Sequence, residues 1–218
     1  MDQTALKKAQ RRLSVAQDAV AGLPKTEDFD AFSKNWYIFL HAAKGIYITL
    51  EQGSKNSPQS RQWFGAKNQE RKSDPLLRYI SEARNDDEHG IEEPVGMTPS
   101  VRTVGVPIPG ASTMFTDEND NLYIRTAPYQ IVDGVPRGFL PGYIPKRLIS
   151  LDGKPVGSVY SPERIVLKRV KDRSGKFYRP PLEHLGRKLQ STAPRDVAKL
   201  TLDYLGELLK EAEGLSTP

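Results

Sequence analysis

Arg84, Asn85 and His89 have side chains and a spacing suited to chemistry on a phosphate group. An imidazole can transfer protons near neutral pH, and a guanidinium can stabilise the charge that develops on a phosphate. Residues 86–88 between them are all acidic, and these acids, together with the helix dipole, favour the protonated imidazole that a general acid needs. The sequence therefore predicts a candidate catalytic set of Arg84, Asn85 and His89.

The element that must position these residues is a helix with its own start and stop signals. Asp74 can cap it, Pro75 suits its first position, and Gly90 suits the residue just past its end. Its apolar stripe is formed by Leu76, Leu77, Ile80 and Ala83.

The helical period also limits what one copy of this helix can do. Asn85 and His89 lie on one face, whereas Arg84 and His89 point roughly 140° apart. One helix therefore cannot easily close both side chains around one phosphate. Two such helix ends that meet across a two-fold axis could do so.

The string Arg84-Asn85-x-x-x-His89 follows a long aromatic helix and a shorter one, and it resembles the Arg-x(4–6)-His signature of the HEPN superfamily. The resemblance covers about residues 1–92 and implies a small helical bundle. Many members of this family are metal-independent endoribonucleases that act as dimers, often in toxin–antitoxin or antiviral systems.

For this chain the resemblance implies a homodimeric ribonuclease that uses the 2′-hydroxyl of RNA as nucleophile. His89 would transfer the proton, Arg84 would stabilise the phosphorane, and Asn85 would orient His89 or the phosphate. It also implies that no metal or cofactor is needed, and it makes an antitoxin protein one candidate partner. The alternative is a charged helix end in which Arg84 and His89 only neutralise the neighbouring acids.

The composition narrows the chemistry and the compartment. The 218 residues contain no cysteine, which excludes disulfides, thiolate zinc sites and a cysteine nucleophile. The opening residues form no apolar signal core, and no apolar run is long enough to cross a membrane. We expect a soluble, cytoplasmic protein without a membrane partner.

Residues 1–92 read as a helical bundle. Helices are predicted over 4–23, over 26–53 with Thr26 as cap, and over about 60–70. The aromatic residues of the second helix are spaced for packing rather than for stacking on bases. His41 lies within that helix and is interpreted as a buried, hydrogen-bonded histidine, since no second ligand stands at metal-binding spacing.

The character of the chain changes after Glu93. Residues 94–194 hold 13 of the 17 prolines, and short β-prone runs replace the helical period. The predicted fold class is α+β: a helical bundle at 1–92, a small loop-rich β module at 93–190, and a C-terminal helix within 191–218. That helix could close the β module, return to the bundle or pair with a second copy.

Hairpin turns are predicted at 118–121 and 172–175, and the second turn lies in a basic hairpin near the end of the β module. Residues 164–179 hold seven basic side chains against one acid, Asp172. Cations interleaved with aromatic rings can hold single-stranded nucleic acid, although an ordinary solvated hairpin shows a similar pattern. This leaves a second hypothesis, a non-catalytic binding protein. The candidate nucleic-acid-binding residues are Lys168, Arg169, Lys171, Arg173, Lys176, Phe177 and Tyr178.

Overall fold

The computed structural model describes residues 1–23, 28–89, 93–99 and 162–215, and the backbone of the strands between 101 and 161. Of residues 88 and 89 it describes the backbone alone. Contacts divide the chain into two units, one made of Met1–Met97 with Ile165–Pro218 and the other of Thr98–Arg164. The chain thus contains both helices and short strand pairs, as an α+β class requires.

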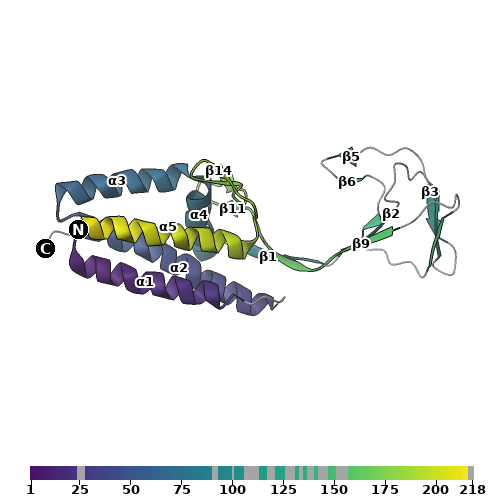
Figure 1. Ribbon diagram of the computed structural model, residues 1–218, viewed down its shortest axis with the longest axis horizontal. Helices are drawn as coiled ribbons and strands as arrows, with labels where there is room; N and C mark the ends of the chain where they lie inside the picture. The colour runs from purple at the N-terminus through teal and green to yellow at the C-terminus, as the bar shows by residue number, and fades with distance from the viewer. Residues whose placement is uncertain are drawn as a thin grey trace. The chain divides into compact units, whose positions relative to one another are not determined.

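The first unit, called the helical unit here, differs from the predicted division at residues 92 and 190. It includes residues 165–190, which the sequence assigned to the β module, and it includes the C-terminal helix. Its helices are α1 (Gln3–Ala21), α2 (Phe29–Ser54), α3 (Pro58–Ser73), α4 (Pro75–His89) and α5 (Pro194–Gly214) (Figure 1). The predicted helices are confirmed within a few residues, while the proposed cap Thr26 lies outside the described residues.

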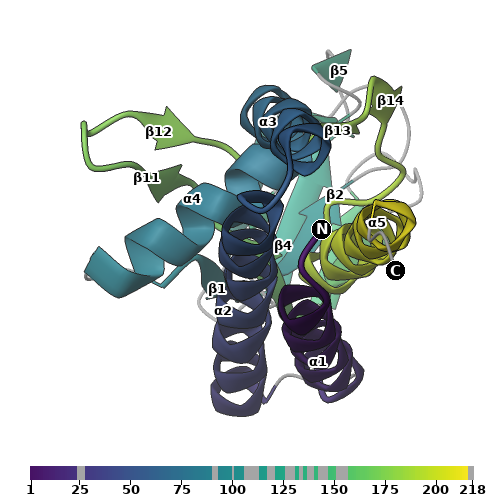
Figure 2. The same cartoon turned by 90° about the vertical axis from the view of Figure 1, so that its left-hand side faces the viewer.

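Helix α2 lies at the centre of the helical unit. It contacts each of the other helices, and Figure 2 shows it with α4 on one side and α1 and α5 on the other. Trp36 and Phe39 are at most 1% exposed, which confirms that these aromatic rings pack in the core, and Leu40 beside them is fully buried. Burying such side chains is the main source of stability in a bundle.

Helix α5 returns to the bundle, which decides among the three positions left open by the sequence. Val197, Leu205 and Leu208 are buried in the same core as α1 and α2. The amino group of Met1 donates a hydrogen bond of 2.7 Å to the carbonyl oxygen of Leu215, so the two ends of the chain meet within this unit. The bundle therefore needs both ends of the sequence.

Three pairs of short strands accompany the helices in the part of the chain that the structure describes. Strand β1 (Val95–Thr98) pairs with β10 (Arg164–Leu167), β11 (Val170–Lys171) pairs with β12 (Phe177–Tyr178), and β13 (Glu183–His184) pairs with β14 (Arg187–Lys188). The predicted turn at 172–175 is confirmed, because the N–H of Gly175 donates to the carbonyl of Asp172 and Gly175 has a positive φ of 87°.

The second unit consists of small sheets. In the first sheet β2 pairs with both β7 and β9, in the second β4 pairs antiparallel with β3 and parallel with β8, and β5 pairs with β6. The antiparallel pair β3–β4 confirms the predicted hairpin around 118–121, whose turn lies outside the described residues. The strands are β2 (Val101–Gly105), β3 (Thr113–Thr116), β4 (Asn121–Arg125), β5 (Ile131–Val132), β6 (Val135–Pro136), β7 (Leu140–Pro141), β8 (Arg147–Ser150) and β9 (Gly157–Ser161).

Among the described residues, none of the helices is both long enough and apolar enough to span a bilayer.

Candidate active site

Helix α4 begins as the sequence predicts. The N–H of Leu77 donates a hydrogen bond of 2.8 Å to Asp74 Oδ1, which satisfies one of the free amides of the first turn. Leu76 and Ala83 are fully buried, so the apolar stripe faces the core and the polar residues of the last turns lie at its edge. The helix therefore holds Arg84 and Asn85 on a fixed frame.

Of the predicted catalytic set, the structure describes the side chains of Arg84 and Asn85, and both are partly buried. The backbone of His89 closes α4, whereas its side chain lies outside the described residues. The amide of Asn85 donates a hydrogen bond of 3.1 Å to Glu82 Oε2, one turn earlier. In the single chain, Asn85 is thus held by its own helix.

The acidic residues before His89 have different environments. Asp86 Oδ2 accepts a hydrogen bond of 2.9 Å from the backbone N–H of Lys171, which fastens strand β11 to α4. Asp87 Oδ2 is buried and has no hydrogen-bond partner among the described residues. The sequence suggested Arg84 or His89 as the partner of Asp86. The structure instead gives Asp86 a partner in the backbone of a neighbouring strand.

His41 is the residue that sequence reasoning missed. Its ring lies 4.1 Å from that of Tyr37 (centroid distance), but its Nε2 is buried without a hydrogen-bond partner in the described part of the chain. The interpretation of His41 as hydrogen-bonded is therefore wrong for this nitrogen. Its placement could have been found from the helical period, because Tyr37, Lys44 and Ile48 share its face of α2.

His41 and Arg84 both lie close enough to Asp87 to affect its pKa. Burial raises the pKa of Asp87 above its ordinary value, and the nearby charges of His41 and Arg84 oppose this rise. His41 Nε2 and Asp87 Oδ2 are both buried without hydrogen-bond partners among the described residues, and such atoms are rare in native structures. We define His41, Arg84 and Asp87 as the α2–α4 cluster.

Replacing the acid of the α2–α4 cluster is expected to stabilise the protein. The raised folded pKa of Asp87 means that its ionised form is disfavoured, so its contribution to stability falls as pH rises above the ordinary value of 3.8. Asp87→Asn should therefore raise the free energy of unfolding at pH 7, by less than about 1 kcal/mol because the group is partly solvated. Urea unfolding at pH 7 measures this, and a loss of stability would contradict the assigned environment.

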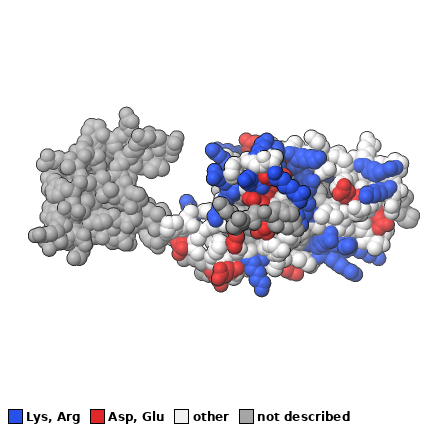
Figure 3. Space-filling model, turned by 180° about the vertical axis from the view of Figure 1, so that it is seen from behind, with Lys and Arg blue, Asp and Glu red and all other residues white. Residues whose placement is uncertain are grey.

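The basic hairpin β11–β12 lies on the same helix. Tyr79 Oη donates a hydrogen bond of 2.6 Å to the carbonyl oxygen of Lys168, and Val170 is fully buried. These contacts explain why residues 165–179 belong to the helical unit. Figure 3 shows Lys and Arg side chains gathered on the face that carries α4 and this hairpin.

The aromatic rings of the hairpin already have cationic neighbours. The guanidinium of Arg169 lies 4.4 Å from the centre of the Phe177 ring, and Arg78 lies 4.6 Å from that of Tyr178. Tyr178 Oη also accepts a hydrogen bond of 2.9 Å from Arg78. Phe177 remains 52% exposed and available to a base, whereas Tyr178 is committed to the protein.

Comparison of the chain with protein-family models, curated proteins and solved structures found no match.

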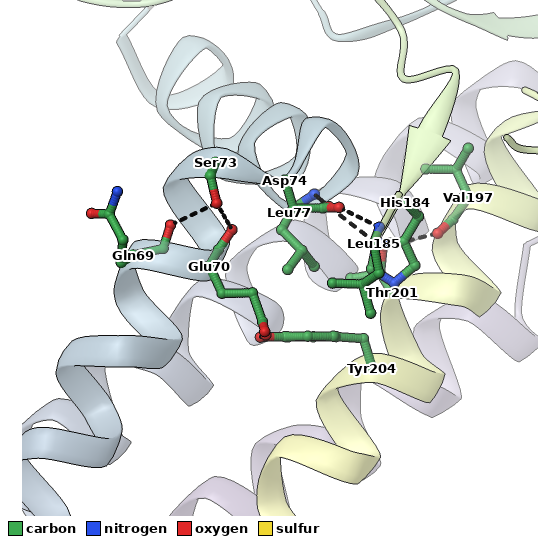
Figure 4. Close-up of polar contacts among 10 residues, drawn as sticks. All are labelled: Gln69, Glu70, Ser73, Asp74, Leu77, His184, Leu185, Val197, Thr201 and Tyr204. Atoms are coloured by element: carbon green, nitrogen blue, oxygen red, sulfur yellow. Dashed lines mark hydrogen bonds and ion pairs between the residues drawn. The ribbon is translucent and has the colours of Figure 1, made fainter. Parts of the chain in front are cut away.

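A buried acid–histidine pair holds the start of α4 (Figure 4). Asp74 Oδ1 lies 3.0 Å from His184 Nδ1, and Asp74 Oδ2 accepts a hydrogen bond of 2.6 Å from the N–H of Leu185. Leu185 and Gly186 both have positive φ, as the two-residue turn between β13 and β14 requires. His184 therefore has a structural partner and ties its hairpin to α4.

In the described part of the chain, no three His, Asp or Glu side chains are grouped so that they could hold a metal ion.

Proposed function

We propose that this protein is a metal-independent endoribonuclease of the HEPN type, with its site at the C-terminal end of α4. The observation that carries the proposal is the α2–α4 cluster, in which the charge of the motif residue Arg84 acts on Asp87, and Asp87 and His41 each have a buried polar atom without a partner among the described residues. Unsatisfied polar groups beside a cation are typical of a site that is completed by a ligand or a second subunit.

The proposed reaction uses the nucleophile that RNA carries. The 2′-hydroxyl attacks the adjacent phosphorus, the bond to the 5′-oxygen breaks, and the products are a 2′,3′-cyclic phosphate and a 5′-hydroxyl. The protonated imidazole of His89 donates a proton to the leaving 5′-oxygen, the 2′-hydroxyl releases its proton to solvent, and Arg84 stabilises the charged phosphorane. Atoms and charge balance without a metal ion or a cofactor.

A homodimer would complete this site, because one helix cannot easily direct Arg84 and His89 at one phosphate. The surface beside the α2–α4 cluster supports such pairing. Tyr37 and Ile48 are 49% and 44% exposed on the face of α2 that also carries His41. Large apolar side chains exposed around buried polar atoms are typical of a surface that another protein covers.

Cleavage in the presence of excess EDTA tests the proposal. We expect RNA to be cut at the same rate with and without EDTA, and the 5′ fragments to end in a 2′,3′-cyclic phosphate. Product ends can be identified by mass spectrometry. Cleavage that EDTA abolishes would contradict the proposed mechanism, as would fragments with a plain 3′-hydroxyl.

The basic hairpin favours a second candidate function, binding of nucleic acid without turnover. Lys168 and Arg169 are exposed, and the guanidinium of Arg169 lies 4.4 Å from the centre of the exposed Phe177 ring. The double variant Lys168→Ala/Arg169→Ala should then weaken RNA binding several-fold and flatten its dependence on salt. Fluorescence anisotropy over a salt series measures both effects. Binding that is lost in this variant, with no cleavage by the wild type, would favour this function over the first.

A further inference from the structure

A hollow of about 340 Å³ lies between helices α2, α3 and α4 and strand β12. Its wall includes Asn85 of the motif, so it adjoins the proposed active site. The volume is at the lower end of the range for small-ligand sites, and it can hold a phosphate with part of its sugar. The other lining residues are Lys44, Arg71, Lys72, Arg78, Ser81, Glu82 and Tyr178.

The lining is strongly basic. Lys44 comes from α2, Arg71 and Lys72 from the last turn of α3, and Arg78 from α4. Glu82 is the acid among the lining residues. Within the described residues, these cations form no ion pair.

The positive charges that line the hollow repel one another. Burial lowers the pKa of Lys44, and the positive charges of Arg71 and Arg84 lower it further. Arg71 Nε is buried and has no hydrogen-bond partner in the described part of the chain, although the guanidinium lies 4.8 Å from the centre of the Tyr47 ring. A bound anion would satisfy this donor and relieve the repulsion between the cations.

The chemistry of the lining selects the anion. Arginine and lysine together are suited to phosphate, and the hydroxyl of Ser81 and the amide of Asn85 add neutral donors. The hairpin next to the hollow also carries the exposed ring of Phe177, on which an unpaired base can stack. Recessed cations with a ring nearby are better matched to a flexible single strand than to a stiff duplex.

We propose that the hollow between α2, α3, α4 and β12 binds a backbone phosphate of single-stranded RNA. The proposal rests on the proposed function for the choice of RNA. The phosphate held there is a neighbour of the one that is cut, so the hollow positions the strand. Binding in the hollow does not require cleavage, and the two can be measured separately.

The test uses a 2′-O-methyl RNA oligonucleotide of mixed sequence, which lacks the nucleophilic hydroxyl and cannot be cut. Its affinity is measured by fluorescence anisotropy in EDTA, from low to moderate salt. The variant is Lys44→Gln/Lys72→Gln. The matched control is Lys7→Gln/Lys8→Gln, which makes the same change of net charge at exposed positions of α1.

We expect the hollow variant to bind at least 10-fold more weakly than the wild type. The slope of log affinity against log salt should fall by roughly 0.7, the amount for one phosphate that is no longer neutralised. The control should bind within twofold of the wild type, and duplex RNA should compete at least 10-fold less well than a single strand.

Several results would overturn the proposal. These are wild-type binding that is undetectable at low salt, a hollow variant that binds like the wild type, a control that loses as much affinity, or a duplex that competes equally well. Lys72→Glu alone provides a second variant without risk to the fold, since Lys72 is exposed, and it should also weaken binding at least 10-fold. If binding behaves as expected and natural RNA stays intact, the phosphate site in the hollow is supported and the nuclease proposal fails.

Discussion

Replacing His89 by alanine is expected to lower the rate of RNA cleavage by at least 100-fold, since positioned proton transfer contributes roughly 10²–10⁴-fold. Arg84→Ala should cause a loss of similar size, because it removes the positive charge beside the phosphorane. Arg84→Lys should recover part of the rate, since it keeps the charge but not the planar fork. Single-turnover cleavage of a fluorescent RNA in EDTA measures these rates.

The matched control for these variants is Arg61→Ala. Arg61 is exposed on α3, and the variant loses one positive charge away from the motif. It should cleave within a few-fold of the wild type. Thermal unfolding should show that His89→Ala and Arg84→Ala remain folded. A folded His89→Ala that cleaves at the wild-type rate would remove His89 from the mechanism.

Asp74→Ala is expected to lower the free energy of unfolding by about 2–4 kcal/mol, since a lost helix cap costs about 1 kcal/mol and a buried donor left without its acceptor costs about 1–3 kcal/mol. The side chain of Asp74 is 4% exposed and that of His184 is 12% exposed. Alanine would leave the imidazole and the N–H groups of Leu77 and Leu185 without their acceptor. Urea unfolding at pH 7 measures the loss.

The pH dependence of this pair has a defined sign. Burial raises the pKa of Asp74, but the hydrogen bonds from His184, Leu185 and Leu77 outweigh burial, so the net pKa lies below its ordinary value of 3.8. A lowered folded pKa gives stability that is present above pH 3.8 and is lost as the pH falls through the folded pKa. Asp74→Ala should lose this part of the acid dependence.

The control for Asp74 is its neighbour. The hydroxyl of Ser73 is exposed and donates to carbonyl groups of its own helix, at Gln69 and Glu70. Ser73→Ala should change the free energy of unfolding by less than about 1 kcal/mol. If Asp74→Ala were no more destabilising than Ser73→Ala, the pair with His184 would not hold the start of α4.

Local signals in the sequence were sufficient to predict the helices. Asp74 and Pro75 define the start of α4 within one turn, and the period of α2 predicts which aromatic rings are buried. The turn at Asp172 was also predictable because its hydrogen bonds form within four residues. Each of these features depends on neighbours along the chain.

Long-range contacts decided the rest. The pair of Asp74 and His184 joins residues 110 positions apart, and Tyr79 reaches the carbonyl of Lys168 across 89 positions. No periodic pattern specifies such a partner, so the sequence could not assign residues 165–190 to the helical unit. The unpartnered nitrogen of His41 was hidden for the same reason, because its surroundings are completed by α4.

The most direct measurement uses an RNA of known cleavage site in which only the nucleotide that supplies the attacking hydroxyl is changed to 2′-deoxy. The wild-type protein is assayed in EDTA against this RNA and against the unmodified strand. The proposed mechanism predicts that cleavage at that bond disappears while other sites in the same molecule are still cut. Continued cleavage at the modified bond would contradict attack by the 2′-hydroxyl and, with it, the proposed roles of Arg84 and His89.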